Sequence, residues 1–245
     1  MSKHLRDYKV LTFDCYGTLI DWETGIWDAL QPLIMLNGRS DITRKSALAA
    51  HAVFESRQQA ETPDILYSDL LEQVHGRFAE KYDLRTTEEL NADFGGSVAH
   101  WPAFPDTADA LRYLKTRYKL VILSNISRAG FTASNRKLGV EFDAIYTAED
   151  IGSYKPATAN FDYLLQHLRQ DLGLAKSDIL HTAQSLFHDH VPAKKFGLAN
   201  AWIDRQRLSE SGEWGATAQV DDQPDFDFLY FSMQEMADAV KAGQA

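Results

Sequence analysis

Hydrophobic and polar positions follow different periods in different parts of the chain. A short β-prone run at 10–13 ends at Asp14. The segment 22–99 has no comparable run; apolar side chains recur there at three- and four-residue steps over 43–60 and 64–82. This spacing is typical of amphipathic helices. The pattern therefore predicts one strand that carries Asp14 at its carboxyl end, followed by an all-helical insertion.

After Pro102 and Pro105 the pattern changes to strands and helices in alternation. The predicted strands lie at 120–123, 144–146, 179–182 and 200–203, and the predicted helices at 107–116, 131–138, 159–171 and 192–196. Strands separated by single helices are joined by right-handed crossovers in a parallel sheet that helices cover on both faces. The sequence thus predicts a doubly wound α/β core with a helical cap inserted after its first strand.

Two further segments complete the chain. Residues 207–224 are rich in Ser, Gly, Asp and Gln, which predicts an exposed loop, and 226–240 predicts a final edge strand and a helix. The core would consist of residues 1–20 and 100–245, and the cap of 21–99. A length of 245 residues fits this division, because domains average roughly 150 residues.

Composition and charge narrow the class of protein. Hydrophobic residues make up 44% and charged residues 24%, which excludes a disordered or low-complexity chain. With 25 basic and 35 acidic residues, the net charge of -10 argues against nucleic-acid and anionic-membrane partners. The single Cys cannot form an internal disulfide, and no apolar run approaches the length of a signal peptide or a membrane span. Cytoplasmic localisation is the default expectation.

Polar residues follow several of the predicted strands. Asp14, the pair Ser124-Asn125, Lys155 and the segment 184–190 all fall near carboxyl ends. Ligands of open parallel sheets bind at this edge. Each group alone is typical of a turn or a helix cap or, for Lys155, of the protein surface. The order Asp, Ser, Lys, Asp at successive strand ends nevertheless predicts an active site.

These motifs resemble those of the haloacid dehalogenase (HAD) hydrolase superfamily, over nearly the entire chain. Residues 10–19 resemble its first motif, and Ser124, Lys155 and 184–189 match the later ones. Segments 13–20, 153–156 and 183–192 are similar to the type II 2-haloacid dehalogenase branch. The resemblance implies a Rossmann-like HAD core with a cap.

The resemblance also implies a set of catalytic residues. Asp14 would be the nucleophile that attacks carbon or phosphorus and forms an ester or an acyl phosphate, which water then hydrolyses. Lys155 would keep Asp14 ionised and oriented. Asp189 would contact Lys155 and position or activate the water. Thr18 would bond to Asp14 and hold its rotamer.

Other residues are expected to contact the substrate. Ser124 and Asn125 would donate hydrogen bonds, Tyr16 and Trp22 would form an apolar wall, and His188 could supply a base or a water contact. Similar dehalogenases usually take an Arg clamp from the first cap helix, but an aliphatic residue stands near that place here. The complete set of expected substrate-binding residues is Tyr16, Trp22, Arg57, Ser124, Asn125, Ser185 and His188.

Two positions differ from the phosphatases of this superfamily. Tyr16 stands where those enzymes carry a second Asp, the acid that protonates an alkoxide leaving group. A phenol with a pKa near 10 supplies that proton poorly, whereas a halide leaves without one. Gln184 stands where an Asp usually binds Mg²⁺, and a neutral amide is a poor substitute for a carboxylate. Both differences favour displacement at carbon without a metal or other cofactor.

The expected function is that of a 2-haloacid dehalogenase-like hydrolase acting on a small carboxylic acid. A ring-opening hydrolase of a strained acid such as azetidine-2-carboxylate is a related alternative. An atypical Mg²⁺-dependent phosphatase and a non-catalytic binding protein with a HAD fold also stay open. Homodimerisation through the cap is a further possibility.

Overall fold

Four buried residues, Val10–Phe13, form strand β1 at the centre of the sheet. The computed structural model describes residues 4–212, 216–221 and 223–243. All neighbouring strands pair in parallel, in the order β3-β2-β1-β4-β5-β6. The other strands are β2 (Lys119–Ser124), β3 (Ala144–Thr147), β4 (Ile179–Ala183), β5 (Ala199–Ile203) and β6 (Phe228–Tyr230). The doubly wound parallel sheet predicted from the sequence is confirmed.

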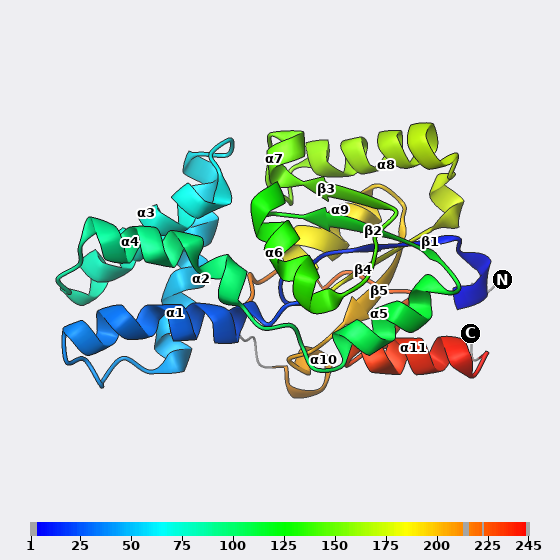
Figure 1. Ribbon diagram of the computed structural model, residues 1–245. Helices are drawn as coiled ribbons and strands as arrows, with labels where there is room; N and C mark the ends of the chain where they lie inside the picture. Colours follow the sequence, from blue (N-terminus) through cyan, green and yellow to red (C-terminus); the bar gives the residue numbers. More distant parts are fainter. Residues whose placement is uncertain (1–3, 213–215, 222, 244–245) are drawn as a thin grey trace.

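Helices cover both faces of this sheet (Figure 1). Alternate residues of a strand point to opposite faces, so Leu11 and Phe13 join one apolar cluster while Val10 joins another. The first face is covered by α5 (Thr107–Lys115), α6 (Arg128–Leu138) and α11 (Met233–Lys241), and the second by α8 (Thr158–Leu172) and α9 (Val191–Lys195). Each predicted strand and helix of this part is present, with ends within three residues.

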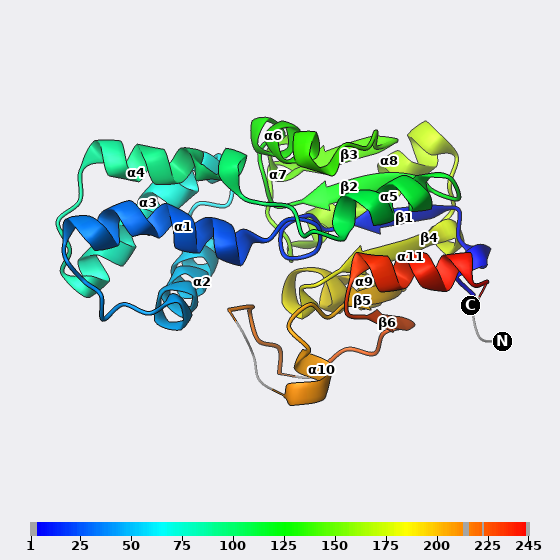
Figure 2. The same cartoon turned by 60° about the horizontal axis from the view of Figure 1, so that its bottom comes forward.

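Four helices between β1 and α5 form a group beside the sheet (Figures 1 and 2). They are α1 (Trp22–Leu36), α2 (Arg44–Glu61), α3 (Tyr67–Tyr82) and α4 (Glu88–Gly95). Asp21, Thr43 and Thr87 cap the first, second and fourth by accepting a backbone N–H in the first turn. Helix α3 begins later than predicted because residues 63–65 form a turn. The division into core 1–20 and 100–245 and cap 21–99 stays a prediction.

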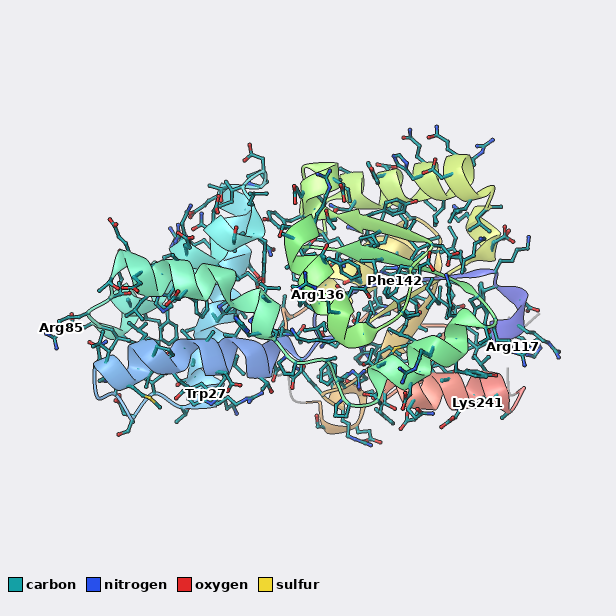
Figure 3. The ribbon with its side chains drawn as sticks, in the orientation of Figure 1. Trp27, Arg85, Arg117, Arg136, Phe142 and Lys241 are labelled. Carbon is teal, nitrogen blue, oxygen red and sulfur yellow. The ribbon has the colours of Figure 1, made fainter. Side chains whose placement is uncertain are left out.

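Short helical segments complete the chain. They are α7 (Ala148–Ile151), α10 (Leu208–Ser211), a π-helical turn (Leu186–His190) and 3₁₀ turns at Leu5–Asp7, Gly96–His100 and Lys176–Asp178. Figure 3 shows the labelled charged side chains Arg85, Arg117 and Lys241 at the periphery. Among the described residues, no helix is long and apolar enough to cross a membrane.

The prediction of an exposed loop over 207–224 is wrong in part. Asp204 accepts the backbone N–H groups of Leu208 and Ser209 and thereby starts α10. Leu208 is buried in a small apolar cluster with Trp202. Residues 216–218 line a cavity that also contacts Asp14, and residues 213–215 and 222 are outside the described part.

Trp101 joins the group of helices α1 to α4 to the turn after β1. Its indole is buried, and it makes edge-to-face ring contacts with Tyr16 at 5.4 Å and with Tyr67 at 6.4 Å between centroids. Helix α1 approaches this ring closely at Gly25, where an added Cβ would lie 2.2 Å from Trp101 Cγ. The close approach requires a residue without a side chain.

We therefore expect Gly25→Ala to lower the free energy of unfolding by about 1–3 kcal/mol through overpacking. Gly76→Ala is the matched control, because an added Cβ in this α3 position meets nothing within 4 Å. It should raise the free energy by roughly 0.5–1 kcal/mol through helix propensity. Urea unfolding of the two variants measures both effects, and equal changes would contradict the packing argument.

Candidate active site

The turn after β1 holds the side chain of Asp14 at the edge of the sheet. Gly17 has φ +96°, and a Cβ at this position would lie 3.0 Å from Oε1 of Gln184. This turn brings the Thr18 hydroxyl back to donate to Asp14 Oδ2 at 2.7 Å, while the same hydroxyl accepts from the Gln184 backbone N–H at 2.9 Å. The Asp14 carboxyl group is thus held from one side by its own turn.

Lys155 holds the same carboxyl group from the other side. Its side chain is only 1% exposed. Its Nζ donates to Asp14 Oδ1 at 3.0 Å, to Asp189 Oδ1 at 2.7 Å and to the Leu123 carbonyl at 3.0 Å. All three ammonium hydrogens are therefore used, which fixes Lys155 between two carboxyl groups.

Asp189 has a second buried partner that was missed from the sequence. Nε2 of His181 lies 2.9 Å from Asp189 Oδ1, and Nδ1 of the same ring lies 2.9 Å from the Thr12 hydroxyl. A carboxylate only accepts hydrogen bonds, so Nε2 donates to it. The available signal was a histidine within a predicted strand, and the whole of that strand is buried. Asp189 Oδ2 is buried without a hydrogen-bond partner among the described residues.

The pKa values of this buried cluster follow from burial and charge. Burial raises the pKa of the Asp14 carboxyl group, and the Lys155 ammonium opposes this only in part. Burial acts in the same direction on Asp189, but Lys155 and His181 outweigh it and lower its pKa. The two carboxyl groups likewise outweigh burial at Lys155 and raise its pKa. Lys155 is therefore a cation, and Asp189 keeps its negative charge to lower pH than Asp14 does.

A π-helical turn, Leu186–His190, brings Asp189 and His188 to the site. The Ser185 hydroxyl accepts the His188 backbone N–H at 3.1 Å and also lies 3.1 Å from the ring Nδ1. Burial lowers the pKa of His188 to about 4, so the ring is neutral near pH 7. Its Nε2 and the Ser124 hydroxyl are both buried without hydrogen-bond partners in the described part of the chain.

Three other expected residues also reach the cavity wall. Tyr16 pairs its hydroxyl with Ser134 of α6 at 2.8 Å, and burial raises its pKa well above the ordinary value. Trp22 lies beside Gly17. The Asn125 side chain both donates to the Lys155 carbonyl at 3.0 Å and accepts its N–H at 2.6 Å. Asn125 therefore holds the Lys155 backbone in place.

The prediction that Arg57 contacts the substrate is wrong. Its side chain is 67% exposed and pairs with Glu61, one turn further along α2, at 2.7 Å. Arg57 is absent from the cavity wall. The helical period turns it to solvent, since Glu55 and Gln59 occupy the inward face. No arginine of the described residues lines this cavity.

The cavity itself has a volume of about 90 Å³. An apolar cavity of about 150 Å³ holds one benzene molecule, so this site suits a compact substrate. Residues at the edge of the sheet and residues of α2 and α3 both contribute to the wall. Residues missed from the sequence are Ala52, Glu55, Ser56 and Gln59 of α2, Tyr67 of α3, and Ala216, Thr217 and Ala218 of the loop.

Comparisons with known proteins show which family the chain belongs to. A family model for haloacid dehalogenase-like hydrolases matches residues 8–181. The chain belongs to the haloacid dehalogenase-like hydrolase family. A 30% identical relative, the (S)-2-haloacid dehalogenase of Pseudomonas fluorescens, aligns over 144 residues, 58% of each chain. The aligned part thus spans less than two thirds of that relative.

Solved structures share the fold of this HAD-like hydrolase. The L-2-haloacid dehalogenase of Xanthobacter autotrophicus with covalently bound chloropropionic acid has a TM-score of 0.76 at 18% identity, covering 97% of this chain and 100% of the other. The magnesium-bound HAD hydrolase YfnB of Bacillus subtilis has a TM-score of 0.72 at 16% identity, covering 96% and 99%. At these identities the similarity establishes the fold.

The HAD-like site does not fit Mg²⁺ well. Asp14 already accepts hydrogen bonds at both oxygens, and the Lys155 ammonium lies between Asp14 and Asp189. Gln184 adds only a neutral amide, whereas Mg²⁺ favours carboxylate oxygens with near-octahedral geometry. Within the described ranges, no group of three or more His, Cys, Asp or Glu is arranged to hold a metal.

Two buried histidines of this hydrolase should make its stability depend on pH. Burial lowers the pKa values of His188 and His190 to about 4, from the ordinary 6.5. Between these values the unfolded chain takes up protons that the folded chain does not, so the free energy of unfolding falls as pH falls. From pH 7 to pH 5 we expect each to contribute a loss of about 2 kcal/mol.

The variant His190→Gln isolates one of these groups, because a Gln amide can still donate to the Ala183 carbonyl that His190 Nε2 contacts at 2.9 Å. Urea unfolding at pH 7, 6 and 5 should show a smaller loss in the variant than in the wild-type protein. Identical pH dependence of the two proteins would rule out a neutral buried His190.

Proposed function

We propose that the protein is a metal-independent dehalogenase-like hydrolase, in which Asp14 displaces halide from the α-carbon of a small carboxylic acid. The observation that carries this proposal is the position of Asp14. Its carboxyl group is held between the Lys155 ammonium and the Thr18 hydroxyl, at the wall of a cavity. The relative that acts as an (S)-2-haloacid dehalogenase supports the same substrate class.

In the first step an Asp14 oxygen attacks the carbon, and the carbon–halogen bond breaks with both electrons going to the halide. The product is an ester of Asp14, and no proton is needed by the leaving group. Tyr16 fits this step because its phenol stays protonated and paired with Ser134. Lys155 and Thr18 orient the nucleophile in advance.

In the second step water attacks the ester carbonyl, which releases the 2-hydroxy acid and restores Asp14. The overall balance is one organic halide plus water to one alcohol, one halide ion and one proton. Asp189 Oδ2 and His188 Nε2 lack protein partners in the described residues and border the cavity, so they would position the water and receive its proton. Lys155 and Thr18 would stabilise the charge on the ester oxygens, and Ser124 would donate to the substrate.

The first test is removal of the nucleophile. Asp14→Asn keeps the shape of the side chain but should lower kcat for chloride release from 2-chloropropionate by at least about 10³-fold. EDTA should not change the wild-type rate. Arg57→Ala serves as the control and should keep the wild-type rate, because Arg57 is exposed. EDTA-sensitive release of phosphate from phosphomonoesters would instead indicate phosphoryl transfer.

The second test follows the oxygen atoms. In a single turnover in H₂¹⁸O, the hydroxy-acid oxygen should come from Asp14, and the label should enter the Asp14 carboxyl group. Mass spectrometry of the peptide that contains Asp14 and of the product measures both. Label in the product during the first turnover would show that water attacks the substrate directly and would exclude the ester.

A further inference from the structure

A carboxyl group of the cap borders the cavity near the nucleophile. Glu55 lies on the inward face of α2, and its side chain is 21% exposed. The Tyr67 hydroxyl donates to Glu55 Oε1 at 2.6 Å, and Gln59 Nε2 donates to the same oxygen at 3.5 Å. Among the described residues, no hydrogen-bond donor reaches Oε2. One oxygen of Glu55 is thus held by Tyr67 and Gln59, and the other lies 3.8 Å from the ring Nε2 of His51, beyond hydrogen-bond distance.

No cation of the protein neutralises this group. Within the described ranges, no lysine or arginine lies within 4.0 Å of Glu55, and its only close basic side chain is His51, at 3.8 Å from Oε2. Burial lowers the pKa of His51 to about 3, so that ring is neutral near pH 7. Burial raises the pKa of the Glu55 carboxyl group, and the hydrogen bond from Tyr67 offsets this rise only in part.

The cavity wall as a whole carries more acidic than basic groups. Its described wall contains the carboxyl groups of Asp14, Glu55 and Asp189 but only the ammonium group of Lys155, which both Asp14 and Asp189 already engage. A substrate with a single negative charge would meet uncompensated negative charge at the cap. A substrate that also carries a positive group on the cap side would not.

We propose that Glu55 and Tyr67 form a subsite for an amino group, and that the natural substrate is a small carboxylic acid that also bears an ammonium nitrogen. This inference rests on the proposed function for the position of the reacting carbon. The ammonium group would donate to Glu55 Oε2, a charge-assisted hydrogen bond that is partly removed from water. The cavity of about 90 Å³ limits the acid to a short chain.

Binding of two unreactive ligands tests the subsite independently of turnover. β-Alanine and butyrate have nearly the same size and differ by an ammonium in place of a methyl group. Titration calorimetry on the wild-type protein should give a Kd for β-alanine about tenfold or more below that for butyrate. In Glu55→Gln, which keeps the oxygen that accepts from Tyr67, this preference should largely disappear.

Glu61→Gln is the matched control, since Glu61 lies on the same helix but pairs with Arg57 and Arg77 at the surface. It should retain the wild-type preference. Equal affinities for the two ligands in the wild-type protein, or an unchanged preference in Glu55→Gln, would refute the amino subsite and leave Glu55 as a structural partner of Tyr67.

The corresponding halides separate this inference from the proposed function. Chloride release from 3-amino-2-chloropropionate should exceed that from 2-chlorobutyrate by about tenfold or more in kcat/KM, and Glu55→Gln should abolish the difference. Selective binding of β-alanine without chloride release from either halide would reject the dehalogenase and retain the subsite. Chloride release from both at equal kcat/KM would reject the subsite and retain the dehalogenase.

Discussion

Lys155 Nζ lies between the carboxyl groups of Asp14 and Asp189 with almost no access to solvent. Removing one partner of a buried ion pair leaves an uncompensated charge, which costs roughly 3–5 kcal/mol. The three residues come from different parts of the chain, so the pair exists only when the parallel strands are assembled. The remaining parts of the site are arranged around this ammonium group. The Asn125 side chain holds the backbone of Lys155 through two hydrogen bonds. The His181 ring donates to Asp189 Oδ1, the same oxygen that accepts from Lys155.

The parallel sheet explains why these groups meet. Strand β1 lies between β2 and β4, and all three end at the same edge of the sheet. Asp14 follows the first, Ser124 ends the second, and the turn that carries Asp189 follows the third. Open α/β sheets bind ligands at this edge because helices cover both faces and leave only the carboxyl ends of the strands accessible.

Helices α2 and α3 line the other side of the cavity with groups of different character. Trp101 contacts both Tyr16, in the turn after β1, and Tyr67 of α3, so its ring links two sides of the cavity wall. On the cap side the polar groups are an acid, an amide and hydroxyls, with no arginine among the described lining residues. In the proposed function the reacting groups thus come from the edge of the sheet, and the proposed amino subsite comes from α2 and α3.

The amino-acid sequence by itself determined the order of elements and the principal cluster. Buried parallel strands are recognisable in a sequence as continuous apolar runs. The motifs at the ends of these runs predicted Asp14, Thr18, Lys155 and Asp189 as site residues. The structure brings these four residues together. The His181 contact with Asp189, the exposure of Arg57 and the inward position of Glu55 were decided only by the tertiary structure. Helical periodicity tells which residues share a face, but not whether a polar face meets solvent or a cavity, because that depends on packing between distant segments.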